Sequence, residues 1–229
     1  MIRYAAPVLV LLAIPATAAE LDFLVGGFDR ISLSGSPDVA VDTGRTPSVR
    51  ATAEQKALDR LDIRVVDGTL QIGSKRGVNW SWDWHDSGKV RVAVTVPLVR
   101  GVGGSGSGSV TVDRIKVPAF AADVGGSGSI RLAALDAQSA SFSIGGSGDV
   151  IAAGHCGSSH ANVGRSGSLK LGGLRCATLD ASIAGSGDIE ANASQTAAIS
   201  VAGSGDVHVA GGAMCSISKV FSGAARCTA

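Results

Sequence analysis

A short Ser-Gly motif returns about every twenty residues along the second half of this chain. Each copy reads Ser-Gly-(Ser/Asp)-aliphatic, and successive glycines are 20, 20, 19, 20 and 18 residues apart. A unit of this length cannot bury its own apolar face, so units of this kind must stack on one another. The six copies begin at Ser107, Ser127, Ser147, Ser166, Ser186 and Ser204, with a degenerate copy at Ser222 and an early relative at Ser34.

Apolar residues alternate with polar ones on both sides of each motif. Residues two and four positions after the glycine are apolar, as in Ile130 and Leu132, and so are those four and six before it, as in Val124 and Ala122. Such alternation is typical of strands with one buried face. We therefore predict a mainly β fold, a parallel β-helix or β-solenoid, with neighbouring coils ~4.8 Å apart. The motif glycine is expected at a corner, where it permits a positive φ, and the serine is expected to form a ladder of hydroxyl groups.

The chain before the repeats is irregular. Residues 28–41 alternate and predict a hairpin or a first coil, residues 53–61 a short helix, and residues 89–96 a strand. Asp67-Gly68 lies between two alternating segments, which is a strong hairpin signal. We predict that residues 20–100 form irregular β coils or a cap, continuous in one domain with the regular coils of residues 101–229, because terminal units of solenoids are commonly atypical.

The first residues have the pattern of a secretory signal peptide. Arg3 is followed by a ten-residue apolar segment from Ala5 to Ile14, then Pro15 and the small residues Ala16-Thr17-Ala18. Ten residues span only about 15 Å as a helix, half of a bilayer core, which disfavours a membrane anchor. We predict a signal peptide over residues 1–19, no membrane span after its removal, and an exported protein that is periplasmic or extracellular.

Four cysteines are consistent with that compartment. An even count in an exported chain predicts two disulfides, and the sequence alone allows three pairings. Cys156 lies eight residues after Gly148 and Cys176 nine after Gly167, so the two occupy nearly the same place on consecutive coils. The spacing of ~4.8 Å suits a disulfide.

The other two cysteines are close in sequence. Cys215 is placed two coils from Cys176, with Ser194 and Gln195 on the coil between them, whereas Cys227 follows only twelve residues later. We predict Cys156–Cys176 and Cys215–Cys227, with the second bridge holding the frayed last coil. A zinc site from His155, Cys156, His160 and Cys176 is the alternative on spacing alone.

Three features together resemble a known family. They are the Asp-Gly-x-Leu-x-Ile hairpin from Asp67 to Ile72, the Val-x-Val-x-Val-Pro segment from Val92 to Leu98, and the repeated Gly-Ser-Gly-(Ser/Asp)-Val units. The combination resembles exported bacterial proteins named putative auto-transporter adhesin head GIN domains, over roughly residues 24–225. The resemblance implies a parallel β-helix-like fold and export to the cell envelope, and it implies no established activity.

The Ser-Gly motif contains serine and aspartate, which could act as nucleophiles or bind calcium, but the surrounding residues and the spacing of the copies disfavour both roles. No base accompanies the recurring serines, so a hydroxyl ladder is favoured over six nucleophiles. Gly-Gly-Ser-Gly-Asp-Val, ending at Val150, differs from calcium-binding nonapeptides because Asp149 comes one position early and the period is about twenty. Asp188 and Asp206 are expected to stack on adjacent coils and to hold at most a weak cation. Asp at turns is ordinarily structural, and no metal, cofactor or catalytic residue is predicted.

Trp80, Trp82 and Trp84 are the only tryptophans, and their alternation places them on one face of a strand. Burial under a loop or as a cap is favoured, because large aromatic side chains are mostly buried. The functional alternative is a platform on which a glycan stacks.

Charge excludes one large class of partner. The chain carries 20 basic and 19 acidic residues, so general nucleic-acid binding is not expected. We expect a non-catalytic, exported structural or interaction module of the cell envelope, whose partner is a glycan or a protein. A carbohydrate-binding module that uses the tryptophan face comes second, and a polysaccharide-active enzyme third.

Overall fold

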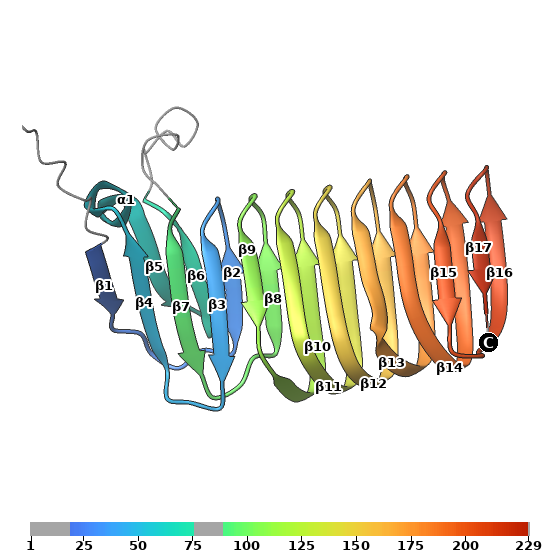
Figure 1. Cartoon of the computed structure of the whole chain (residues 1–229), viewed down its shortest axis with the longest axis horizontal. Helices are drawn as coiled ribbons and strands as arrows, with labels where there is room; N and C mark the ends of the chain where they lie inside the picture. The colour runs from blue at the N-terminus through green and yellow to red at the C-terminus, as the bar shows by residue number, and fades with distance from the viewer. Residues whose placement is uncertain (1–18, 76–88, 229) are drawn as a thin grey trace, which may run out of the picture.

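The computed structural model describes residues 19–75 and 89–228 and is an elongated stack of short coils (Figure 1). Two sheets enclose one core. One sheet contains the strands that lead into each Ser-Gly corner, and we call it the pre-corner sheet; the other contains the strands that follow each corner, the post-corner sheet. The predicted β-solenoid is confirmed. Residues 1–18, which hold most of the predicted signal peptide, lie outside the described residues.

Five long strands make the regular part of the stack. All five pair in parallel with their neighbours. The last four run from one corner, around the opposite side of the coil, to the next corner or close to it, whereas the first begins at Ile115, beyond the bend. Register shifts such as the one between Leu132 and Leu135 mark the bend in the strand. These strands are β10 (Ile115–Val124), β11 (Ser129–Ile144), β12 (Asp149–Val163), β13 (Ser168–Ile183) and β14 (Asp188–Ala202).

The core consists of columns of inward side chains, one from each coil. In β11 the inward residues Ile130, Leu132, Phe142 and Ile144 are at most 1% exposed. Full burial of one such side chain contributes roughly 1.5–3 kcal/mol. Because each residue stacks on its equivalent in the next coil, the period-two pattern of the sequence becomes one continuous core.

The spatial order of the first coils differs from their sequence order. β2 (Arg30–Leu33) pairs in parallel with β6 (Thr69–Ser74) and β8 (Gly101–Gly104). β3 (Asp38–Thr43) likewise pairs in parallel with β7 (Arg91–Val96) and β9 (Ser109–Val112). The coil of residues 30–43 therefore lies between the coil that contains β6 and β7 and the coil that contains β8 and β9. Of the two alternatives for residues 28–41, the coil is correct and the hairpin is wrong.

Antiparallel strands close the N-terminal end. In the described part of the chain, β1 (Ala19–Phe23) pairs only with β4 (Ser48–Ala53), which pairs with β7, while β5 (Leu61–Val66) pairs only with β6. The predicted Asp67-Gly68 hairpin joins β5 to β6. The helix α1 (Gln55–Arg60) connects the two sheets at the corner side and buries Ala57 and Leu58.

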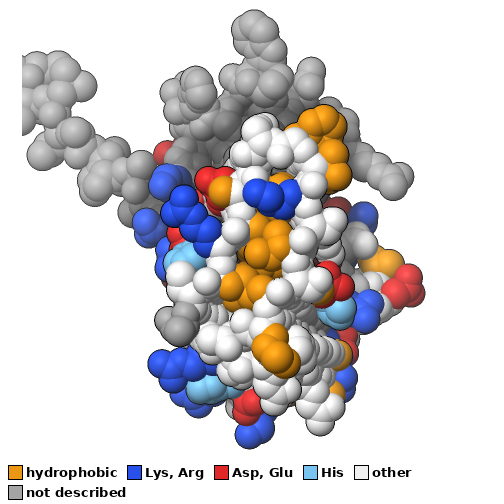
Figure 2. Space-filling model, turned by 90° about the vertical axis from the view of Figure 1, so that its right-hand side faces the viewer, with side chains coloured by type: hydrophobic (Ala, Val, Ile, Leu, Met, Phe, Trp, Pro, Cys, Tyr) orange, Lys and Arg blue, Asp and Glu red, His pale blue; other side chains and the backbone are white. Residues whose placement is uncertain are grey.

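At the C-terminal end of the stack, the described residues form no cap over the apolar side chains of the last coil (Figure 2). β15 (Val207–Ala210) pairs with β14 and β17 (Ala225–Cys227), and the one partner of β16 (Met214–Val220) among residues 19–75 and 89–228 is β14. Lys219 lies beside Val201, at the end of an inward column that is otherwise aliphatic in the regular coils.

Candidate functional site

The Ser-Gly corners form a ladder bonded through the backbone. In one step, the amide nitrogen of Ser147 donates to the carbonyl oxygen of Gly126 at 3.0 Å, and that of Asp149 donates to the carbonyl of Gly128 at 3.2 Å. The motif serines are exposed and the following glycines buried. Ser204 and Ser222 hydroxyls lie 3.4 Å apart. The serines are thus parts of a turn, as the sequence predicts, and no base is bonded to them in the part of the chain described.

The role predicted for the motif glycines was wrong. None of the six motif glycines has a positive φ, although Gly35 of the early relative has φ 95°. They are required because the coils approach closely: a Cβ at Gly148 would lie 2.1 Å from the carbonyl oxygen of Gly128, and one at Gly187 would lie 2.2 Å from that of Gly167. The constraint is steric contact with the preceding coil, so it is invisible in a single copy of the motif.

The corner aspartates bond to the next coil. Oδ1 of Asp188 accepts from the backbone nitrogen of Asp206 at 3.1 Å, and Oδ1 of Asp206 accepts from that of Ala224 at 3.0 Å. Asp149 lies 3.5 Å from Lys170. These contacts give the carboxylates a structural role. Among residues 19–75 and 89–228, no group of three or more His, Cys, Asp or Glu is arranged to hold a metal ion.

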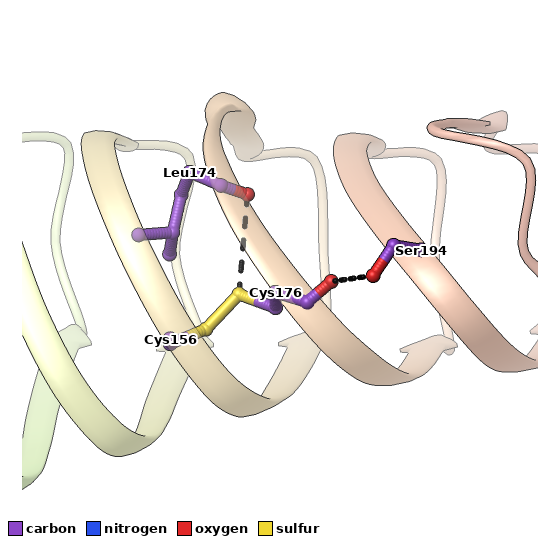
Figure 3. The surroundings of a disulfide bond; sticks show 4 residues. All are labelled: Cys156, Leu174, Cys176 and Ser194. Carbon is purple, nitrogen blue, oxygen red and sulfur yellow. Dashed lines mark hydrogen bonds between the residues drawn. A yellow bond between two sulfur atoms is a disulfide. The ribbon is translucent and has the colours of Figure 1, made fainter.

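The structure contains both predicted disulfides. Cys156 and Cys176 lie side by side on consecutive coils with their Cα atoms 4.5 Å apart, so this bridge runs along the stack (Figure 3). Cys215 and Cys227, with Cα atoms 6.6 Å apart, join the two sheets of the last coil across its interior. One coil lies between Cys176 and Cys215. On that coil Ala193 pairs with Cys176 and Ala197 pairs with Cys215, whereas the repeat spacing predicts Ser194 and Gln195 at these positions.

The bridge at Cys156 excludes the zinc alternative. Both thiols that the site needs are joined, and Sγ of Cys176 packs 3.9 Å from the carbonyl oxygen of Leu174. His160 instead lies 3.7 Å from Asp180 on an exposed face. Trp80, Trp82 and Trp84 lie outside the described residues, so the glycan platform stays a prediction.

A depression of about 490 Å³ lies on the post-corner sheet near its C-terminal end. Its polar side chains include two carboxylates already bonded to backbone, and His208, whose Nε2 lies 3.3 Å from the Thr228 hydroxyl. The charged members are exposed. The lining residues are Asp188, Ile189, Glu190, Asp206, Val207, His208, Ala224, Arg226 and Thr228.

An ion pair occupies the edge of the N-terminal end. Nε of Arg50 donates to Oδ1 of Asp22 at 2.7 Å and Nη2 donates to Oδ2 at 3.2 Å. This hydrogen bonding holds the pKa of Asp22 below its ordinary value and raises that of Arg50. Glu20 adds a longer contact of 3.6 Å to the same guanidinium. The group is exposed, so it marks a charged strand edge and not a catalytic centre.

The family model described as "Putative auto-transporter adhesin, head GIN domain" matches residues 27–213. The chain belongs to this family. The GIN-domain fold recurs in a putative adhesin of Bacteroides fragilis NCTC 9343, with a TM-score of 0.84 and 21% identity over 93% of this chain and 97% of that one. No curated protein matches this chain.

Two further solved structures share the fold. A putative lipid binding protein of Parabacteroides distasonis ATCC 8503 has a TM-score of 0.74 and 20% identity, covering 94% of this chain and 98% of that one. A putative adhesin of Parabacteroides merdae ATCC 43184 has a TM-score of 0.73 and 17% identity, covering 94% and 97%. At these identities the comparison establishes the GIN-domain architecture alone.

In the described residues no helix is long and apolar enough to cross a membrane.

Proposed function

We propose that this GIN-domain protein is a non-catalytic, adhesin-like interaction module that is exported to the cell envelope. The family and the two disulfides support export. The observation that carries the proposal is the form of the polar surface: the outward side chains of the regular coils repeat in columns along the stack instead of converging on one centre. Catalysis requires convergent groups, such as a nucleophile beside a base or a pair of carboxylates.

The pre-corner sheet is the surface we assign to binding. From β10 onward, one of its outward columns begins at Asp123 and then contains only small hydroxyl and amide side chains, in register from coil to coil. Such an array offers hydrogen-bonding groups at a ~4.8 Å repeat, which suits a polymeric partner such as an envelope glycan held by many weak contacts. That column contains Ser143, Asn162, Ser182, Ser200 and Ser218.

Binding to isolated cell envelopes and to a panel of purified polysaccharides tests the proposal. The double variant Asn162→Arg/Ser182→Arg places two bulky cations on the pre-corner sheet and is expected to abolish binding. Thr111→Arg, on the outward face of the post-corner sheet, is the matched control and is expected to bind normally. Equal binding by both variants would refute the assignment of the surface.

The same panel separates the alternatives. Loss of binding in Trp82→Ala with normal binding by the Asn162→Arg/Ser182→Arg variant would favour the tryptophan platform. Release of reducing ends from a polysaccharide, abolished by Glu190→Gln, would establish an enzyme and contradict the proposal.

A further inference from the structure

Exposed large hydrophobic side chains gather at the two ends of the stack. Eight are exposed in the described residues, and all except Leu98 belong to a terminal strand or the segment beside it. At the C-terminal end Met214 is 76% and Phe221 80% exposed. Figure 2 shows apolar side chains in the middle of this end. Apolar surface concentrated in this way marks an interaction site. The other members are Leu21, Leu24 and Val66 at the N-terminal end and Ile217 and Val220 at the C-terminal end.

Both ends also finish in strands with one neighbour each. Among the described strands, β16 pairs only with β14 and β17 only with β15, while β1 pairs only with β4 and β5 only with β6. Each such edge carries backbone N–H and C=O groups that can accept a further strand. The pre-corner sheet ends in β5 and β16, and the post-corner sheet in β1 and β17. Each sheet therefore has one edge strand at each end of the molecule, so a second copy placed end to end could continue both sheets.

The charges at the two ends are opposite along one outward column. This column of the post-corner sheet runs through every coil, from Arg226 at the C-terminal edge to Asp22 at the N-terminal edge. If a second copy continues the strand spacing, Arg226 of one chain lies beside Asp22 of the other. The column contains, in order, Arg226, His208, Glu190, Lys170, Ile151, Arg131, Thr111, Ala40, Ala93, Arg50 and Asp22.

The same charges disfavour a symmetric contact. Residues 207–228 contain Lys219 and Arg226 but no Asp or Glu. Two C-terminal ends placed together would bring these like charges together, and neither edge strand contributes a carboxylate to separate them. The N-terminal end supplies Glu20 and Asp22 on β1, and the helix α1 at the same end contains Asp59.

We propose that the C-terminal end of this chain binds the N-terminal end of a second copy by strand addition, with β17 meeting β1 and β16 meeting β5. The contact is heterologous and does not close on itself, so repetition produces an open filament. Arg226 and Asp22 select the partner end, and the apolar side chains of both ends are buried between the copies. This inference is independent of the proposed function, because it uses the ends and not the faces.

Sedimentation velocity of the exported, purified chain over a range of concentrations tests the inference. Wild type is expected to form species larger than dimers, and less so at high salt. Arg226→Asp and Asp22→Arg should each weaken association roughly tenfold or more, since each sets like charges opposite one another. Arg131→Asp, in the same column at mid-stack, is the matched control and should associate like wild type.

Mixing the two end variants distinguishes a lost contact from a damaged fold. Every contact between the Arg226→Asp and Asp22→Arg chains pairs opposite charges, so the mixture should form alternating filaments although each variant alone stays small. Wild type that remains monomeric, association that stops at a dimer, or a mixture that fails to associate would each overturn the proposal.

Discussion

Removal of the terminal disulfide should release the last coil without unfolding the rest of the stack. Cys215 and Cys227 are 12 residues apart in sequence, and the loop-entropy relation gives about 2.8 kcal/mol for closing such a loop. The strands that carry these cysteines, β16 and β17, each have one neighbour among the strands that the structure describes. In the double variant Cys215→Ser/Cys227→Ser the coil should therefore open roughly a hundredfold more often.

Trypsin reports this opening, because Lys219 and Arg226 are its cleavage sites in the last coil. When reclosing is faster than cleavage, the cleavage rate follows the population of the open form. The rate at Lys219 should rise by roughly a hundredfold in the variant. Products must be separated after reduction, since the bridge otherwise holds the two pieces of wild type together.

The matched control is Cys156→Ser/Cys176→Ser. This bridge has a sequence separation of 20, which gives a larger entropic contribution of about 3.3 kcal/mol. It joins interior coils that have neighbours on both sides, so its loss should lower the melting temperature and leave cleavage at Lys219 unchanged. Equal acceleration at Lys219 in both variants would refute the idea that the last coil opens separately.

Three other predictions concern the stack. In Gly148→Ala the new Cβ would lie 2.1 Å from a carbonyl oxygen of the preceding coil, so the variant should lose about 1–3 kcal/mol of unfolding free energy in urea. The control Gly145→Ala has no atom within 4 Å of the new Cβ and should stay within about 0.5 kcal/mol of wild type. Ser159→Ala should raise the unfolding free energy by about 1 kcal/mol, because its buried hydroxyl has no hydrogen-bond partner among the described residues; a lower midpoint would contradict this. Asp22 has a pKa lowered by its arginine partner, so its contribution to stability is present above the unfolded-state pKa and is lost as pH falls through the folded-state value. Wild type should therefore exceed Asp22→Asn slightly in urea midpoint at neutral pH, and a difference that persists below both pKa values would argue against the ion pair.

The regular coils follow from the sequence because their contacts repeat. A period near twenty fixes which residues stack, so Cys156 and Cys176 fall side by side and Ile130 points into the core. Both results depend only on counting between copies of one motif. The short helix and the Asp67-Gly68 hairpin also follow, since both are local signals.

The N-terminal coils could not be ordered in the same way. β2 lies between β6 and β8, and these contacts join segments about forty and seventy residues apart with no shared period. The role of the motif glycines was missed for a related reason. A positive φ is a property of one residue, whereas the clash at Gly148 arises from a neighbouring coil.

Disulfide mapping of the protein isolated from the cells that produce it tests the central claim most directly, because one experiment reports both the coil register and the compartment. Digestion without reduction, followed by mass spectrometry, should recover Cys156 linked to Cys176 and Cys215 linked to Cys227. A peptide that joins Cys176 to Cys215 would contradict the stacking of the coils, and four free thiols with bound zinc would contradict an exported, disulfide-bonded module.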